Sequence, residues 1–214
     1  MTISLPLPEN SADSRLIVVL RGQHAEELPP VIDTMVSAGV RSFELTLTTP
    51  DVFDLLPTLA QKYGAEVDLG VGTITTVDEV DRAVTAGAQY LVTPVTDPEV
   101  VDHALATEVP LIPGGFTPSE LFSTWKRGVS AVKVFPAGRV GPGYVKDLRG
   151  PFPDMAIVPS GGVDLAAAAQ WLDAGAAAVS VGGPLLGDAL LGGDLSTLAE
   201  RSRAFVELCR KGAA

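Results

Sequence analysis

The chain has 214 residues, 46% of them hydrophobic, and a formal net charge of −11 at pH 7. This length suits one large domain with a sizeable core, so we expect a single domain over residues 1–214 with 1–14 as an N-terminal extension. The acidic balance argues against nucleic acid or an anionic membrane surface as a partner. Cys209 is the only cysteine, and no stretch has the length of a signal or a membrane span. We therefore expect a cytoplasmic protein without an intramolecular disulfide.

Short apolar runs alternate along the chain with segments of helical spacing. The predicted strands are 16–20, 42–46, 67–71, 90–93, 110–112, 131–135, 156–159 and 178–182. The predicted helices are 24–38, 52–63, 77–86, 98–106, 118–127, 165–172 and 195–210. Strands that are apolar on both faces are typical of parallel sheets covered by helices.

Eight strand–helix units predict a parallel α/β fold, and their number favours a (β/α)8 TIM barrel over an open doubly wound sheet. A glycine recurs before four of the strands, at steps of about two units: Gly39, Gly87, Gly128 and Gly175. An open sheet would more often carry a glycine-rich nucleotide turn after its first strand. Here Leu20-Arg21-Gly22-Gln23 lacks the G-x-G-x-x-G pattern.

Among the polar residues that end the predicted strands, only Glu44 and Lys133 are acid–base groups embedded within a strand. Catalytic groups of barrels lie at the carboxyl ends of strands, and a buried ammonium either pairs or gives up its proton. A neutral lysine is a nucleophile for carbonyl carbon. Two alternatives are open. The aliphatic part of the Lys133 side chain could be buried while its ammonium group reaches solvent, or Lys133 and Glu44 could form a purely structural ion pair. Buried ion pairs add little net stability, which favours a functional role for this one.

A lysine with a carboxyl partner suits Schiff-base aldol chemistry, in which an iminium stabilises the neighbouring carbanion and the carboxyl group moves protons. We expect no cofactor beyond a covalent imine on Lys133. We also expect no metal, because His24 and His103 stand alone and no clustered ligand pattern occurs. Both histidines are expected at the surface.

Glycine pairs follow the last two strands, Gly161-Gly162 and Gly182-Gly183. Bare backbone N–H groups at this place commonly bind phosphate in barrels, and the alternative is close helix–strand packing. Gly70-Val71-Gly72-Thr73 could similarly hold a carboxylate through backbone N–H groups and the Thr73 hydroxyl.

Taken together, the chain resembles the 2-keto-3-deoxy-6-phosphogluconate (KDPG) and 4-hydroxy-2-oxoglutarate (KHG) aldolase family from Leu16 to about Cys209. The order and spacing of several modest motifs carry the resemblance. They are Val19-Leu20-Arg21, Phe43-Glu44-Leu45-Thr46, Gly70-Val71-Gly72-Thr73, Thr93-Pro94, Pro113-Gly114, Val132-Lys133-Val134-Phe135-Pro136-Ala137, Gly150-Pro151-Phe152-Pro153 and Pro159-Ser160-Gly161-Gly162-Val163.

The resemblance implies a class I aldolase on a (β/α)8 barrel, usually a homotrimer, which reversibly cleaves a 2-keto-4-hydroxy acid to pyruvate and an aldehyde. It also implies a place in carbohydrate metabolism of the Entner–Doudoroff type. Lys133 aligns with the imine-forming lysine and Glu44 with the general acid/base. The implied substrate-binding residues are Arg21, Gly72, Thr73, Pro94, Phe135, Ser160, Gly161, Gly162, Gly182 and Gly183.

Two positions depart from the common family pattern. Thr48 stands where many members have arginine, so we expect Arg21 to supply the guanidinium. Pro184 stands where serine commonly helps to hold phosphate, which removes a hydroxyl and an N–H donor. The aldehyde is accordingly left open between glyceraldehyde 3-phosphate, glyoxylate and another acceptor.

Two other functions stay open at this point. The glycine pairs would also suit a phosphate-using isomerase or transferase, and the two departures would suit a non-catalytic trimeric barrel that binds a small acid.

Overall fold

The computed structural model of the protein describes residues 5–211. All strand pairings within these residues are parallel. The described strands are β1 (Leu16–Leu20), β2 (Ser42–Thr46), β3 (Asp68–Gly72), β4 (Tyr90–Val92), β5 (Leu111–Ile112), β6 (Gly114–Gly115), β7 (Val132–Val134), β8 (Ile157–Pro159) and β9 (Val179–Val181).

The strands pair in the order β5-β4-β3-β2-β1-β9 in one sheet and β6-β7-β8 in a second. An isolated parallel bridge joins Ser160, directly after β8, to Ser180 of β9. The predicted parallel α/β class is thus confirmed, and each predicted strand is found within one or two residues of its expected bounds. The fifth predicted strand differs in one detail. It is interrupted at Pro113, which cannot donate a hydrogen bond to a ladder, and a second short strand, β6, follows.

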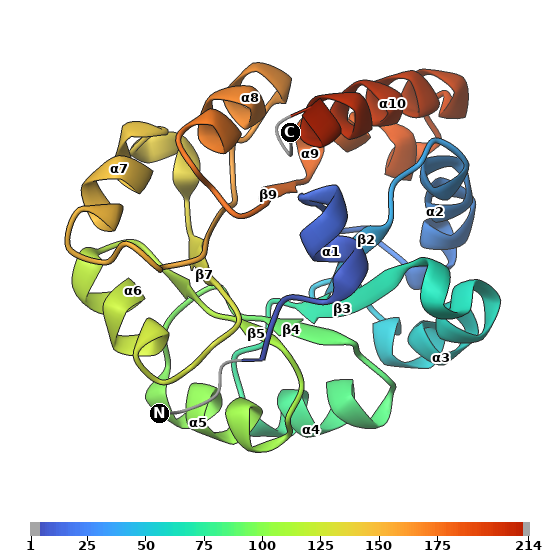
Figure 1. Cartoon of the computed structure of the whole chain (residues 1–214). Coiled ribbons are helices and arrows are strands. Elements are labelled where there is room, and N and C mark those ends of the chain that lie inside the picture. Colours follow the sequence, from blue (N-terminus) through green and yellow to red (C-terminus); the bar gives the residue numbers. More distant parts are fainter. Residues whose placement is uncertain (1–4, 212–214) are drawn as a thin grey trace.

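Helices surround the strands (Figure 1). They are α1 (Glu9–Ser14), α2 (Leu28–Ser37), α3 (Val52–Tyr63), α4 (Val77–Thr85), α5 (Pro98–Ala106), α6 (Pro118–Trp125), α7 (Gly143–Arg149), α8 (Leu165–Asp173), α9 (Gly183–Leu186) and α10 (Leu195–Lys211). The prediction of one helix over 24–38 was wrong at its start. A 3-10 helix, Ala25–Glu27, comes first, and α2 begins at Leu28 because Pro29 and Pro30 fit only a first turn.

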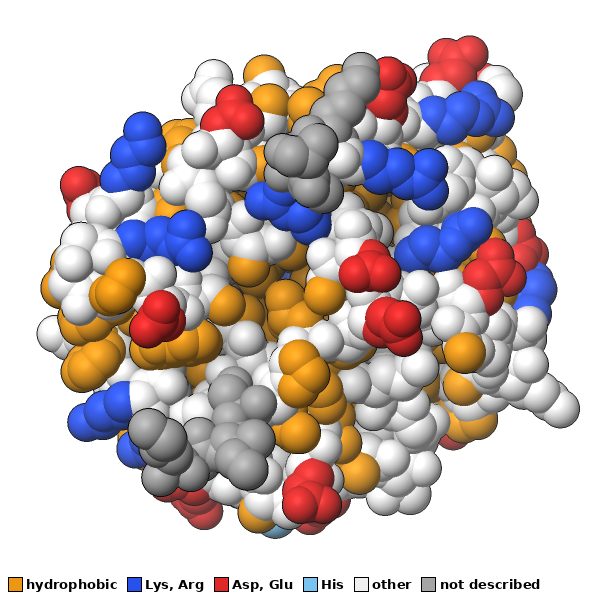
Figure 2. All heavy atoms as spheres, viewed as in Figure 1, with side chains coloured by type: hydrophobic (Ala, Val, Ile, Leu, Met, Phe, Trp, Pro, Cys, Tyr) orange, Lys and Arg blue, Asp and Glu red, His pale blue; other side chains and the backbone are white. Residues whose placement is uncertain are grey.

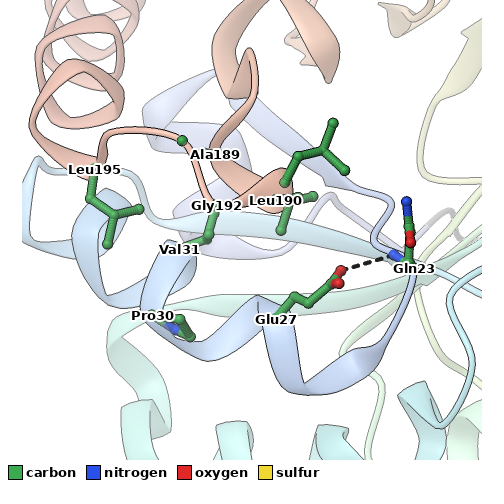
Figure 3. Close-up of a pocket in the computed structure, with 10 residues that line it drawn as sticks. Gln23, Glu27, Pro30, Val31, Ala189, Leu190, Gly192 and Leu195 are labelled. Atoms are coloured by element: carbon green, nitrogen blue, oxygen red, sulfur yellow. Dashed lines mark hydrogen bonds between the residues drawn. The ribbon is translucent and has the colours of Figure 1, made fainter.

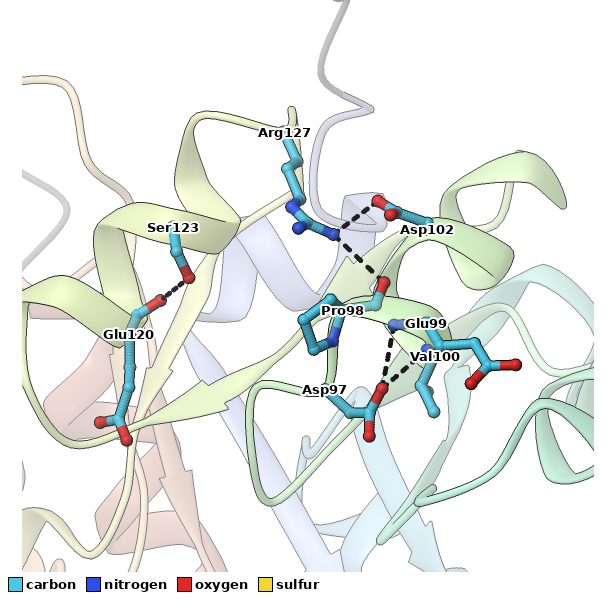
Figure 4. A network of polar contacts seen from close by, with 8 residues as sticks. All are labelled: Asp97, Pro98, Glu99, Val100, Asp102, Glu120, Ser123 and Arg127. Carbon is cyan, nitrogen blue, oxygen red and sulfur yellow. Dashed lines mark hydrogen bonds and ion pairs between the residues drawn. The ribbon is translucent and has the colours of Figure 1, made fainter.

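Side chains at the start of α5 and after the end of α6 hydrogen-bond groups of α5, among them backbone N–H groups that the helix leaves without partners. Asp97 caps α5 by accepting hydrogen bonds from the backbone N–H groups of Glu99 and Val100, at 2.9 and 3.3 Å. Arg127, which follows α6, donates to Asp102 and to the carbonyl of Pro98 at 2.6 and 3.1 Å (Figure 4). This network fixes α5 against the end of α6.

Helix α1 lies inside the ring of outer helices, at the amino ends of β2 and β3 (Figure 1). The buried carboxylate of Asp68 accepts hydrogen bonds from the backbone N–H and the hydroxyl of Ser11 at 2.6 and 2.8 Å. The Ser11 hydroxyl also shares a hydrogen bond with Ser42, whose hydroxyl in turn bonds the phenol of Tyr90 at 3.1 Å. Burial raises the pKa of Tyr90 well above its ordinary value, so the phenol stays neutral. The predicted N-terminal extension therefore contributes a helix that is tied to the strands.

The core has two parts. The larger fills the space between strands and helices, and a smaller cluster lies among strand residues that include Ile17, Tyr90 and Val158. Burial raises the pKa of the Cys209 thiol to about 11, which keeps it protonated at neutral pH.

Around the edge of the face that bears α1, basic and acidic side chains are interspersed (Figure 2). None of the helices within residues 5–211 is long and apolar enough to span a membrane.

Candidate active site

A cavity of about 350 Å³ opens at the carboxyl ends of the strands. The structure brings into its lining every predicted site residue except Gly72, together with Val19 and Pro184. The lining residues are Val19, Arg21, Glu44, Thr73, Pro94, Lys133, Phe135, Ser160, Gly161, Gly162, Gly182, Gly183 and Pro184. Val19 was not predicted, because an apolar residue in an apolar strand gives no signal of its own.

Lys133 and Glu44 meet in the floor of this cavity, although 89 positions of chain separate them. They belong to β7 and β2, where their neighbours are buried apolar residues. Lys133 Nζ lies 3.7 Å from Glu44 Oε1, and the two residues are 6% and 1% exposed. Among the described residues, Glu44 Oε1 is the one buried side-chain polar atom without a hydrogen-bond partner. Such an oxygen is costly to bury, which indicates that a ligand atom or water completes the site.

Gly72 makes room for the carboxylate. A Cβ built on Gly72 would lie 2.0 Å from Glu44 Oε1 and 2.5 Å from two further atoms of that side chain. The residue type at position 72 is therefore set by steric exclusion. The next residue, Thr73, has a φ of +65°, which is uncommon for a residue with a branched Cβ, and its hydroxyl bonds no group within residues 5–211.

The Phe135 ring forms one wall of the cavity. Its centroid lies 5.3 Å from Lys133 Nζ, within the range of a cation–π contact. A Cβ on Gly161 would come within 3.1 Å of the same ring, and Gly161 has a φ of +87°. Glycine at this position thus lets the backbone approach the aromatic wall.

The part of the cavity lining that follows β8 and β9 is mostly backbone. Gly161 and Gly162 both have positive φ values, and their N–H groups bond no acceptor in the described part of the chain. The Ser160 hydroxyl shares a hydrogen bond of 3.1 Å with Ser180. Gly182 precedes α9, and Pro184 within that helix has no N–H to offer.

Arg21 is exposed at the cavity edge, and its guanidinium forms no ion pair or hydrogen bond within residues 5–211.

The two histidines lie away from the cavity lining. His24 is exposed, and His103 lies at the surface 2.7 Å from an oxygen of Asp81, as expected. The described residues contain no group of three or more His, Cys, Asp or Glu side chains that could hold a metal ion.

A lysine and a carboxylate buried together at the carboxyl ends of parallel strands suit a lyase that works through an imine. A family model described as KDPG and KHG aldolase matches residues 9–199. The chain belongs to this family, and it is an aldolase of the class I, Schiff-base type.

Individual relatives agree with this assignment. The chain is 32% identical over 197 residues to the 2-dehydro-3-deoxy-6-phosphogalactonate aldolase of Escherichia coli K12, covering 92% of this chain and 95% of the relative. A solved structure described as native KDPGal superposes with a TM-score of 0.85 at 30% identity, over 100% of this chain and 99% of that one. A KDPG aldolase from Legionella pneumophila, 26% identical with a TM-score of 0.78 over 94% and 95% of the chains, was solved with pyruvate as a covalent carbinolamine.

Proposed function

We propose that the protein reversibly cleaves a 2-keto-4-hydroxy acid to pyruvate and an aldehyde through an imine on Lys133, with Glu44 as the proton carrier. The observation that carries this proposal is the buried approach of Nζ to Oε1 at 3.7 Å, with Oε1 lacking a hydrogen bond. Family membership favours this reaction over an isomerase, a transferase or a non-catalytic barrel.

The first half of the reaction forms the imine. The neutral amine of Lys133 adds to the C2 carbonyl carbon, and the resulting carbinolamine holds a hydroxyl at that carbon. Glu44 in its protonated form donates to this hydroxyl, which leaves as water while the C=N bond forms. The iminium so produced withdraws electrons from the neighbouring C–C bond.

The second half breaks the bond between C3 and C4. The Glu44 carboxylate takes the proton of the C4 hydroxyl, the C4–O bond becomes a carbonyl, and the C3–C4 electron pair moves toward the iminium to give an enamine. The aldehyde is then free. Protonation of the enamine at C3 and hydrolysis of the imine release pyruvate and restore the amine.

The remaining predicted residues suit binding roles. Arg21 and the Thr73 hydroxyl would hold the keto-acid carboxylate, because each offers a donor without a partner in the described chain, whereas Gly72 belongs to the ladder between β2 and β3. Pro94 and Phe135 would pack against the pyruvyl methylene. The far end of the substrate would meet a mostly backbone surface, formed by Ser160, Gly161, Gly162, Gly182 and Gly183.

We further infer that the two sheets are arcs of one closed (β/α)8 barrel in a single domain. The Ser160–Ser180 bridge spans one junction, and β5 and β6 adjoin at Pro113 across the other. The family resemblance also supports a homotrimer, which sedimentation equilibrium would test.

Borohydride reduction in the presence of pyruvate should attach one pyruvate-derived group, at Lys133, because only an imine is trapped this way. Mass spectrometry of the whole protein and of its peptides checks the number and position of the labels. Borohydride without pyruvate is the control. A label on another lysine, or none at saturating pyruvate, would contradict the proposed imine.

The preference for a phosphorylated substrate should be modest, about tenfold or less in kcat/KM. Pro184 removes one N–H donor and the usual hydroxyl, and a hydrogen bond to a charged group is worth about 1.5–3 kcal/mol. Pyruvate release from 2-dehydro-3-deoxy-6-phosphogluconate, its galactonate epimer and 4-hydroxy-2-oxoglutarate measures the preference. A thousandfold preference would show that the glycine N–H groups compensate fully.

A further inference from the structure

We propose that Thr49 and Glu27 are positioning residues that hold the backbone on the C-terminal side of Arg21, and so direct its guanidinium at the substrate carboxylate. The proposal rests on the proposed role of Arg21 in binding that carboxylate. Neither residue lines the catalytic cavity, so both would act through Arg21.

The first contact lies directly after Arg21. The backbone N–H of Gly22 donates to the hydroxyl of Thr49 at 3.0 Å, and Thr49 is 2% exposed. One residue before Arg21, the carbonyl of Leu20 accepts from the hydroxyl of Thr46, also buried, at 3.1 Å. Thr46 at the end of β2 and Thr49 just after it therefore hydrogen-bond the residues on either side of Arg21.

The second contact continues along the same loop. One carboxylate oxygen of Glu27 accepts from the backbone N–H of Gln23 at 2.9 Å and of His24 at 3.3 Å. Figure 3 shows the Glu27 side chain reaching back to Gln23 from the end of the 3-10 helix, directly before α2. A Cβ on Gly22 would lie 3.0 Å from that oxygen, so the loop passes close to the carboxylate.

The Arg21 side chain, in contrast, has no partner of its own within residues 5–211. It lines two adjoining cavities, the catalytic one and a neighbour of about 500 Å³ bordered by Gln23, Leu186 and Leu190. A long, unpartnered side chain between two cavities loses conformational entropy when it binds an anion in one of them. Fixing its backbone lowers that cost and selects the catalytic side.

The test is Thr49→Val, which keeps the shape of the side chain and removes the acceptor for the Gly22 N–H. We expect the pyruvate concentration for half-maximal borohydride labelling, and KM for the keto acid, to rise by about tenfold, because the backbone that carries Arg21 loses a buried hydrogen bond. The value of kcat should stay within about twofold. In an Arg21→Met background the same change should alter both quantities less than about twofold, because residues that act through one another are not additive.

Thr49→Ser, which keeps the hydroxyl, should restore wild-type labelling. Thr34→Val is the matched control, because it removes a hydroxyl from a half-buried residue of α2 that lies outside the loop after β1. Glu27→Ala is an independent second variant that keeps the proposal testable if Thr49→Val does not fold. It should raise the same two quantities in the wild-type background and change them less than about twofold in the Arg21→Met background. Equal effects of either variant with and without Arg21 would overturn the positioning role. Wild-type protein that takes up no pyruvate label would instead overturn the proposed function itself.

Discussion

Lys133→Met should lower kcat/KM for retro-aldol cleavage by at least about 10⁴-fold and abolish pyruvate labelling under borohydride. Methionine fills the space of the lysine stem but has no amine to form the carbinolamine, and loss of a nucleophile of this kind removes most of the rate enhancement. Coupled assay of released pyruvate measures the first effect, and mass spectrometry measures the second.

The matched control for this substitution is Lys126→Met, at an exposed residue directly after α6. It should leave both turnover and labelling unchanged. Labelling that persists in the Lys133→Met variant would place the imine on another lysine. Thermal unfolding of the variant distinguishes loss of chemistry from loss of fold.

Glu44→Gln should reduce turnover by about 10²- to 10⁴-fold, the range in which general acid–base groups contribute. The amide has nearly the same shape above Gly72 but cannot carry a proton between the C4 hydroxyl, the carbinolamine and solvent. Imine formation with pyruvate should persist at a lower rate. Stopped reduction by borohydride at a series of times separates the rate of imine formation from the overall rate.

An exposed carboxylate provides the control for this second substitution. Glu66→Gln changes a residue whose side chain is 57% exposed and paired with Arg41 at 3.5 Å, and it should leave turnover unaffected. Turnover by Glu44→Gln within a factor of about ten of the wild type would mean that water or another group transfers the proton.

The fold could be predicted from the sequence wherever side chains carry the signal. Segments such as 16–20 and 52–63 were found with their observed bounds, because continuous apolar runs and helical spacing reflect burial directly. Strand β6 is a pair of glycines, and its ladder with β7 uses backbone groups alone, so no side-chain pattern marks it. The short helices α7 and α9 likewise lack an extended apolar period.

The candidate site was predictable where a charge interrupts an apolar strand, as at Glu44 and Lys133. The steric requirement for glycine at position 72 could not be predicted. The motif pointed to carboxylate binding, and the clash with Glu44 exists only in three dimensions. The same holds for Thr49, whose hydroxyl meets the Gly22 N–H across 27 positions of chain and belongs to no local pattern.

The place of the proposed imine in the fold bears on the order in which molecules move through the site. Glu44, Gly70 and Tyr90 share one register level, and a Cβ on Gly70 would lie 2.3 Å from the Tyr90 ring. The ring and the hydroxyl network that links it to α1 thus lie on the amino-terminal side of the Glu44 carboxylate, whereas the exposed residues of the cavity lining include Arg21 and Phe135. Because the proposed imine keeps the pyruvyl part bonded to Lys133, we expect the aldehyde to depart first in cleavage and pyruvate to bind first in condensation, an order that product-inhibition kinetics would test.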